Sequence, residues 1–318
     1  MTGSVSVIIT SKDRPMYLAQ AVESVLNQTH PVYEIIIVDD GSKNEFLERI
    51  DDIKKFSPII NLFYLQESRG PSYARNFALD KASGVFVIFL DDDDLIHPEM
   101  IASSLPLFNE KVDIVISWYA CFFPPNDSPE QMNASLRAMP WETPPGFVRP
   151  VYQTCFEDLE MRPFHELLCY THPIHSMLIR RRSLGNVRFP EDLRVGEDRY
   201  FFLDLAYQGC RFKCNRTINA FYRRHIGNQT CRDNYYQNLI KFHERLLSSK
   251  MLHDPEDIFF INSQIFLILL KQKSLKSAKY LIYMTRSPRY YPKYIALYLN
   301  LIIQKQLMAR RIRMHVEA

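Results

Sequence analysis

Short apolar runs alternate with amphipathic segments along the first 120 residues. Five runs rich in Val, Ile, Leu and Phe predict buried strands, at residues 4–10, 34–40, 59–65, 85–90 and 112–119. Between them apolar residues recur at helical spacing, which predicts helices at residues 15–26, 44–56, 72–81 and 98–108. Continuously apolar strands joined by helices are typical of a parallel sheet that is covered on both faces. The pattern therefore predicts an α/β fold with a mostly parallel sheet.

The alternation stops after this region. Residues 124–150 are rich in Pro, Asn and Ser and predict an irregular insertion, followed by a strand at 172–181 and a helix that residues 195–202 open and that runs to about residue 207. From residue 235 onward the pattern is helical, with a helix start at Asp254-Pro255. We therefore expect a main domain at 1–234, with halves at 1–119 and 120–234, and a basic helical region at 235–318.

Four carboxylates follow the strand at 85–90 directly, in the order Asp91-Asp92-Asp93-Asp94. Neighbouring carboxylates about 4 Å apart repel each other by roughly 4 kcal/mol at an effective dielectric constant of 20. A bound Mg²⁺ or Mn²⁺ that also holds a substrate diphosphate would relieve this repulsion, with Asp91 and Asp93 on the same side of an extended chain. The alternative is a solvated acidic turn that caps the helix beginning near Pro98.

The carboxyl ends of parallel strands meet at one edge of a sheet, where ligands bind in open α/β folds. Thr10, Asp40 and the acidic run from Asp91 to Asp94 should therefore lie around one crevice. The turn after the first strand, Ser11-Lys12-Asp13-Arg14-Pro15, contains no glycine. Its sequence excludes the G-x-G-x-x-G loop of dinucleotide-binding dehydrogenases.

Five motifs occur in a fixed order: V-S-V-I-I-T, I-I-V-D-D-G-S, A-R-N, F-L-D-D-D-D and G-E-D-R-Y-F. Together they resemble the motifs of family 2 glycosyltransferases over about residues 4–230. The resemblance implies the GT-A fold, a nucleotide-diphosphate-sugar donor, Mn²⁺ or Mg²⁺ as cofactor, and inversion at the anomeric carbon. It makes 1–119 the nucleotide-binding half and 120–234 the acceptor side.

The resemblance also implies roles for residues on the donor side. Asp40, with Asp39 nearby, would accept a hydrogen bond from the base, and Arg75 of A-R-N would lie beside it. The D-x-D motif makes Asp91 and Asp93 the metal residues, Asp93 being the direct ligand and Asp91 or Asp92 lying nearer the ribose. Further donor contacts are implied for Thr10, Asp13 and His225.

The E-D motif implies that Asp198 is the catalytic base, with Glu197 beside it. An inverting transfer needs one base for the acceptor hydroxyl and a separate cation for the departing diphosphate. The alternative interpretation of Glu197 and Asp198 is that both only complement the dipole of the helix they begin. The Q-x-x-R-W motif of processive synthases is absent from the sequence, which favours addition of a single sugar.

UDP-sugars are the expected donors, because a carboxylate at Asp40 suits the ring N–H of uracil, although dTDP and GDP stay open. The expected acceptor is a glycan or lipid-linked acceptor in surface polysaccharide synthesis. Two other functions remain: a non-catalytic sugar-nucleotide-binding protein and a sugar nucleotidyltransferase. The second would need a glycine-rich phosphate loop after the first strand.

Composition adds the expected location. Six scattered cysteines and no evident signal peptide predict a cytoplasmic protein. Residues 271–318 contain many basic residues and tyrosines but a single acidic residue, Glu317. Such a segment either packs as core helices or docks on an anionic membrane surface at the inner face of the cell membrane. No nucleic acid partner is expected.

Overall fold

The computed structural model describes residues 3–122, 148–151, 156–225, 234–272, 274, 276, 277, 279 and 280. The chain divides into two compact units, Met1–Arg232 and Asp233–Ala318. The predicted insertion at 124–150 and the basic tail beyond residue 280 lie almost wholly outside the described residues.

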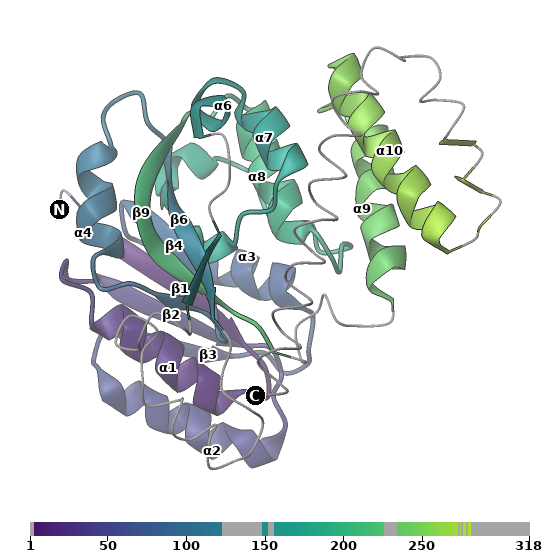
Figure 1. Ribbon diagram of the computed structural model, residues 1–318. Helices are drawn as coiled ribbons and strands as arrows, with labels where there is room; N and C mark the ends of the chain where they lie inside the picture. The colour runs from purple at the N-terminus through teal and green to yellow at the C-terminus, as the bar shows by residue number, and fades with distance from the viewer. Residues whose placement is uncertain are drawn as a thin grey trace, which may run out of the picture. The chain divides into compact units, whose positions relative to one another are not determined.

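A mixed sheet organises the first unit (Figure 1). Its strands lie in the order β3-β2-β1-β4-β8-β6-β9-β5, and β7 pairs with β6. The strands are β1 (Val5–Ser11), β2 (Glu34–Asp39), β3 (Ile60–Tyr64), β4 (Phe86–Asp91), β5 (Leu95–Ile96), β6 (Ile114–Phe122), β7 (Val148–Val151), β8 (Met177–Arg180) and β9 (Phe212–Arg223).

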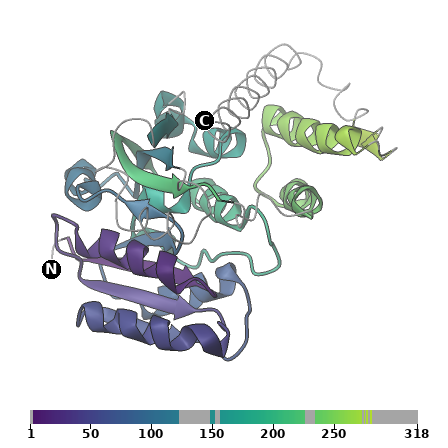
Figure 2. The same ribbon diagram turned by 60° about the horizontal axis from the view of Figure 1, so that its bottom comes forward.

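Strands β1 to β4 form the parallel half that the apolar runs predict. In the other half β8 is antiparallel to β4 and β6, whereas β9 is parallel to β6. The long green strand in Figures 1 and 2 is β9, which crosses this second half. Strands contributed by distant parts of the chain therefore extend the parallel half into one continuous sheet.

Helices occur in both units. The first unit holds α1 (Pro15–Leu26), α2 (Asn44–Ile53), α3 (Pro71–Lys81), α4 (Met100–Ser104), α6 (Phe156–Met161), α7 (Pro163–Cys169) and α8 (Glu197–Tyr207), and the second holds α9 (Tyr235–Ser248) and α10 (Pro255–Lys271). Short 3₁₀ turns lie at Lys54–Phe56, Leu105–Leu107, Ile174–Ser176 and Arg181–Leu184.

Two of the predicted elements are much shorter in the structure. The helix expected at 98–108 is the short α4 followed by a 3₁₀ turn, since Pro106 in that turn lacks the N–H that a longer helix needs. The strand expected at 172–181 is only β8, because the preceding residues form a turn in which Ser176 N–H donates to Pro173 O. That turn carries His175 toward the acidic run after β4.

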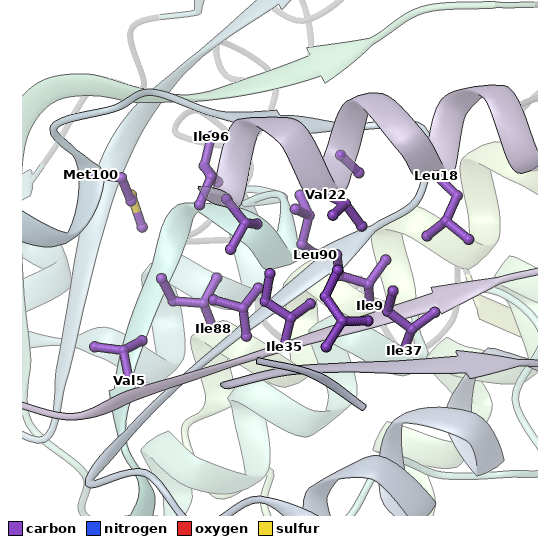
Figure 3. Packing of buried hydrophobic residues seen from close by; sticks show 14 of the residues in the cluster. Val5, Ile9, Leu18, Val22, Ile35, Ile37, Ile88, Leu90, Ile96 and Met100 are labelled. Carbon is purple, nitrogen blue, oxygen red and sulfur yellow. The ribbon is translucent and has the colours of Figure 1, made fainter. Parts of the chain in front are cut away.

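The core of the parallel half lies between the sheet and helices α1 and α2 (Figure 3). Leu18 and Val22 of α1 contact a layer of side chains from β1, β2 and β4, including Ile9, Ile37 and Leu90. Helix α3 also packs on β1 and β2, but none of its residues belongs to this cluster, so it covers the opposite face. Buried on both faces, the strands can expose polar groups only at their ends.

Gly41, directly after β2, lies where a side chain would clash. Its φ is +69°, and an added Cβ would lie 2.8 Å from Ser68 N and 2.9 Å from Glu67 C. We expect Gly41→Ala to lower the free energy of unfolding by about 2–4 kcal/mol in urea titration, because backbone strain and the clash add. Gly185→Ala is the control, since its φ is +49° but an added Cβ meets nothing within 4 Å. Equal losses in both variants would mean that the close approach to residues 67–68 contributes nothing.

The second unit begins its main helix where the sequence predicts. Asp254 caps α10, accepting a hydrogen bond from Glu256 N at 2.8 Å. Tyr280, one of the tyrosines of the predicted membrane surface, is buried, and its hydroxyl donates to Glu244 Oε1 at 2.8 Å. For Tyr280 this favours inward packing; the other tail tyrosines lie outside the described residues. Within the described part of the chain, no helix is long and apolar enough to cross a bilayer.

Candidate active site

The ends of three parallel strands bring the predicted residues together. Thr10 pairs in register with Val38 of β2 and with Asp91 of β4, and Ser11 pairs with Asp39. The side chains that follow β1, β2 and β4 therefore gather at one edge of the sheet, as the sequence predicts.

The two outer carboxylates of the acidic turn have separate partners. Asp91 binds Arg75, with Nη2 to Oδ1 at 2.6 Å. Asp94 is buried, accepts from the backbone N–H of Arg223 at 2.8 Å, and lies 3.1 Å from His175 Nδ1. Arg75 at Asp91, and His175 with the backbone N–H of Arg223 at Asp94, thus reduce the repulsion expected between the carboxylates.

The two middle carboxylates share one arginine. Arg14 contacts Asp92 Oδ1 at 2.6 Å and Asp93 Oδ2 at 2.5 Å, while Ser11 Oγ donates to Asp92 at 2.7 Å. Burial raises the pKa of Asp92 to about 8, against the lowering effect of Arg14. Burial acts to raise the pKa of Asp93 as well, but the hydrogen bond from His225 (Nε2 to Oδ2, 2.9 Å) and the charge of Arg14 lower it to about 2. The two carboxyl pKa values are therefore shifted in opposite directions, that of Asp93 downward and that of Asp92 upward.

The loop after β1 is fastened to the turn after β2. Asp13 has a φ of +57°, the one positive value among the described non-glycine residues. Its N–H donates to Ser42 Oγ at 2.7 Å, and its carboxylate accepts from Lys43 N at 2.8 Å. Asp13 thus fixes the backbone from which Arg14 reaches the acidic turn.

Asp39 and Asp40 organise their own turns. Asp39 accepts hydrogen bonds from the backbone N–H of Ser42 at 2.9 Å and from its hydroxyl, and burial raises its pKa. Asp40 accepts from Ser68 Oγ at 2.7 Å and from the N–H groups of Arg69 (2.7 Å) and Gly70 (2.9 Å). Asp40 therefore ties the segment before α3 to the end of β2. A base contact by either acid stays a prediction.

Arg75 links the acidic turn to the E-D motif. It is 4% exposed, and besides Asp91 it contacts Glu197 with Nη1 to Oε1 at 3.2 Å. Among the hydrogen bonds and ion pairs of the described residues, none joins Arg75 to Asp40, and the placement of Arg75 beside the nucleotide base stays a prediction. Its guanidinium lies instead between the donor edge and the residues predicted to carry the chemistry.

The E-D motif begins α8 after Gly196, whose φ is +79°. Burial and the charge of Asp198 raise the pKa of Glu197 to about 7, although Arg75 opposes the shift. Burial also raises the pKa of Asp198, again against Arg75, but Asp198 is only half-buried, and its Oδ1 accepts from Arg199 N at 2.7 Å. Of the two, Asp198 is the more accessible carboxylate.

The raised pKa of Glu197 makes stability depend on pH. The carboxyl is protonated more readily in the folded chain than in the unfolded chain, so its contribution to stability is greatest below the unfolded pKa and is lost as pH rises toward 7. We expect the free energy of unfolding to fall by about 1–3 kcal/mol between pH 5 and pH 8, and Glu197→Gln to reduce that slope. Urea titrations at several pH values measure it; an unchanged slope in the variant would assign the dependence to the other buried acids.

Sequence analysis missed several residues of this site. Arg223 is 2% exposed and donates from Nε to Asp93 O and from Nη2 to Gln20 Oε1, both at 2.7 Å. The ring of Tyr17 lies 5.3 Å from that of His225, and Arg223 lies over the same tyrosine ring at 4.7 Å. The run Tyr222-Arg223-Arg224-His225 indicates such contacts, because adjacent arginines within an apolar stretch need acidic or carbonyl partners.

The donor set fits a divalent cation at Asp93. The pKa of its carboxyl is lowered, His225 Nε2 lies 2.9 Å from its Oδ2, and a carboxylate oxygen with an imidazole nitrogen suits Mn²⁺. The Asp91 side chain is 32% exposed and has its second oxygen outside the contact with Arg75. Among described residues, however, no three acidic, histidine or cysteine side chains already converge as a metal cage. A cation here would complete its shell with ligand oxygens, as Mg²⁺ and Mn²⁺ do with diphosphates.

Comparison with known proteins assigns the family. Residues 6–182, more than half of the chain, match the family model described as Glycosyl transferase family 2. The chain belongs to glycosyltransferase family 2. This family 2 chain is 27% identical over 271 residues to the minor teichoic acid biosynthesis protein GgaB of Bacillus subtilis (strain 168), covering 82% of this chain and 28% of GgaB. It is also 27% identical over 297 residues to an uncharacterized glycosyltransferase of Haemophilus influenzae, covering 88% and 86%.

The matched stretches span only part of several other curated relatives, covering 15, 25, 42 and 40% of the lengths of four of them. Among solved structures, residues 1–349 of S. aureus TarS in complex with UDP-GlcNAc give a TM-score of 0.61 at 18% identity, covering 84% of this chain and 72% of that one. The mannosyltransferase PcManGT of Pyrobaculum calidifontis, in complex with GDP-Man and Mn²⁺, gives 0.52 at 16% identity, covering 92% and 82%. These likenesses confirm the GT-A fold of the family 2 chain.

Proposed function

We propose that this protein is an inverting, metal-dependent glycosyltransferase that moves one sugar from a UDP-sugar to a hydroxyl of a glycan or lipid-linked acceptor. The observation that carries the proposal is the bridge made by Arg75. It joins Asp91, at the donor edge, to Glu197, the neighbour of Asp198. A base held beside a donor site is the arrangement that single-displacement transfer needs.

In this mechanism Asp198 takes the proton of the acceptor hydroxyl as that oxygen attacks the anomeric carbon from the side opposite the diphosphate. The half-buried carboxylate has one oxygen held by Arg199 N, which orients the side chain and leaves the other for the acceptor. Glu197, fixed by Arg75, holds the first turn of α8 in place. Asp198 and the donor turn thus act from separate elements.

Asp93 and His225 are the residues that would hold Mn²⁺ or Mg²⁺, with Asp91 close by. The cation supplies charge neutralisation for the departing diphosphate. The contacts of Asp93 with Arg14 and His225, and the Mn²⁺ in the name of the PcManGT complex, support this assignment.

UDP is the proposed nucleotide, because the TarS complexes contain UDP and UDP-GlcNAc and because Asp40 directly follows β2 at the same edge. The hydrogen bonds from Ser68, Arg69 and Gly70 leave Asp40 little free capacity. A contact with uracil N–H would therefore accompany a shift of the segment at 68–70. The similarity to GgaB supports a surface polysaccharide as the product.

Calorimetry with UDP and CDP, each with Mn²⁺, tests the nucleotide. We expect UDP to bind at least ten-fold more tightly than CDP, because cytosine lacks the ring N–H that a carboxylate accepts. Equal or tighter binding of CDP would refute the uracil assignment. Release of UDP from UDP-sugars, followed with and without candidate glycans, separates an enzyme from a binding protein, since the latter gives no turnover at any concentration.

A further inference from the structure

Arg14 occupies the side of the acidic turn where a donor diphosphate and its cation would bind. Its Nη1 and Nη2 contact Asp93 Oδ2 and Asp92 Oδ1 at 2.5 and 2.6 Å, so one guanidinium bridges two carboxylates. The arginine side chain is 37% exposed, whereas Asp92 is fully buried and Asp93 nearly so. Arg14 therefore covers the carboxylates from the solvent side.

The backbone beneath Arg14 is held firmly. Asp13 bonds Ser42 and Lys43, and α1 begins directly after Arg14 with Pro15. Only the long side chain of Arg14 is free to change direction. It can leave the carboxylates without any change in the fold of the loop.

We infer that Arg14 is a tethered counter-cation, which holds Asp92 and Asp93 in the nucleotide-free enzyme and turns to the donor diphosphate when a divalent cation takes its place. A guanidinium fork that spans two carboxylate oxygens also matches two oxygens of a diphosphate. The exchange leaves no charged group without a partner, because the divalent cation pairs with the carboxylates while the guanidinium pairs with the diphosphate. This inference rests on the proposed function, since it requires the cation at Asp93.

The test measures Mn²⁺ binding to nucleotide-free protein by electron paramagnetic resonance. Arg14→Gln should bind Mn²⁺ on the order of ten-fold more tightly than wild type, because no guanidinium competes for the carboxylates. With saturating Mn²⁺, calorimetry should show UDP binding to the variant about ten-fold more weakly. Arg14→Lys keeps the charge and should resemble wild type in Mn²⁺ affinity.

Arg182→Gln is the control for net charge. Arg182 is exposed, and its neighbour Arg181 bonds Val85 O, at the end of β4 opposite the acidic turn. Unchanged Mn²⁺ affinity in Arg14→Gln, or an equal gain in Arg182→Gln, would overturn the inference. If neither wild type nor variant binds Mn²⁺, even with UDP, the metal in the proposed function fails and the exchange fails with it.

A second measurement needs only wild-type protein and the lysine variant. The side-chain ¹⁵N resonance of Arg14, assigned by its loss in Arg14→Lys, should shift on addition of UDP with Mg²⁺ and much less with UMP, which lacks the second phosphate. Equal shifts with UMP and UDP would contradict contact with a diphosphate.

Discussion

Asp198→Asn should lower kcat by a factor on the order of 10² to 10⁴ while leaving the affinity for UDP-sugar nearly unchanged. The amide cannot accept the acceptor proton, but it can still accept the hydrogen bond from Arg199 N that orients the carboxylate. Initial rates at saturating donor and acceptor give kcat, and calorimetry gives donor affinity. The separation of chemistry from binding is the decisive feature of this result.

The matched control lies on the same helix. Asp204→Asn makes the same chemical change two turns further along α8, where the carboxylate accepts from Gln208. It should keep wild-type kcat. If Asp198→Asn instead lost donor affinity and kept its turnover at saturation, Asp198 would be a donor ligand. Glu197 would then be the next candidate for the base, and Glu197→Gln would test it.

Asp93→Ala should reduce Mn²⁺-dependent UDP binding by at least a hundred-fold, to the level that wild type shows with EDTA. The ionised carboxylate is the direct ligand in the proposed site, and the methyl group that replaces it cannot bind a cation. The fold should survive, because Arg14 keeps its contact with Asp92 after the change. Calorimetry with Mn²⁺ or EDTA measures the first effect and thermal unfolding the second.

Asp80→Ala serves as the control, since it deletes a surface ion pair with Arg188 at the end of α3 and leaves the acidic turn intact. Its UDP binding should remain dependent on Mn²⁺. Wild-type activity indifferent to EDTA, or full Mn²⁺ dependence in Asp93→Ala, would remove the metal role from Asp93.

The parallel half of the sheet could be predicted because its signal is local. An apolar run such as residues 86–90 has no polar face to expose and so favours burial on both faces, and the charged residues at its end then lie at the ligand edge of the sheet. The same reasoning missed β9, where Lys213, Asn215 and Arg216 interrupt the apolar residues. A bulge against β6 near Trp118 further breaks its alternation.

The partners of the acidic turn could not be derived from local patterns. Arg14 lies close to β1, but nothing near it in the sequence indicates Asp92 and Asp93 as its partners. His225 and Arg223 follow the turn by well over a hundred residues, and only the sheet order brings β9 beside it. The partners of Arg75 could not be predicted for the same reason, because one acid comes from β4 and the other from the much later α8.

The position of β8 has a consequence for biosynthesis of the chain. One edge of β4 is closed by β8, which pairs Arg180 with Phe86 and Ile179 with Val87, about ninety residues further along the chain. During translation β1 to β4 can assemble as soon as they emerge, yet β4 then presents an open, apolar edge until β8 is made. Nascent chains that stall in this interval would be substrates for chaperones and prone to aggregation. Synonymous codons that slow translation of the segment between β4 and β8 would lengthen the time for which the edge of β4 is exposed.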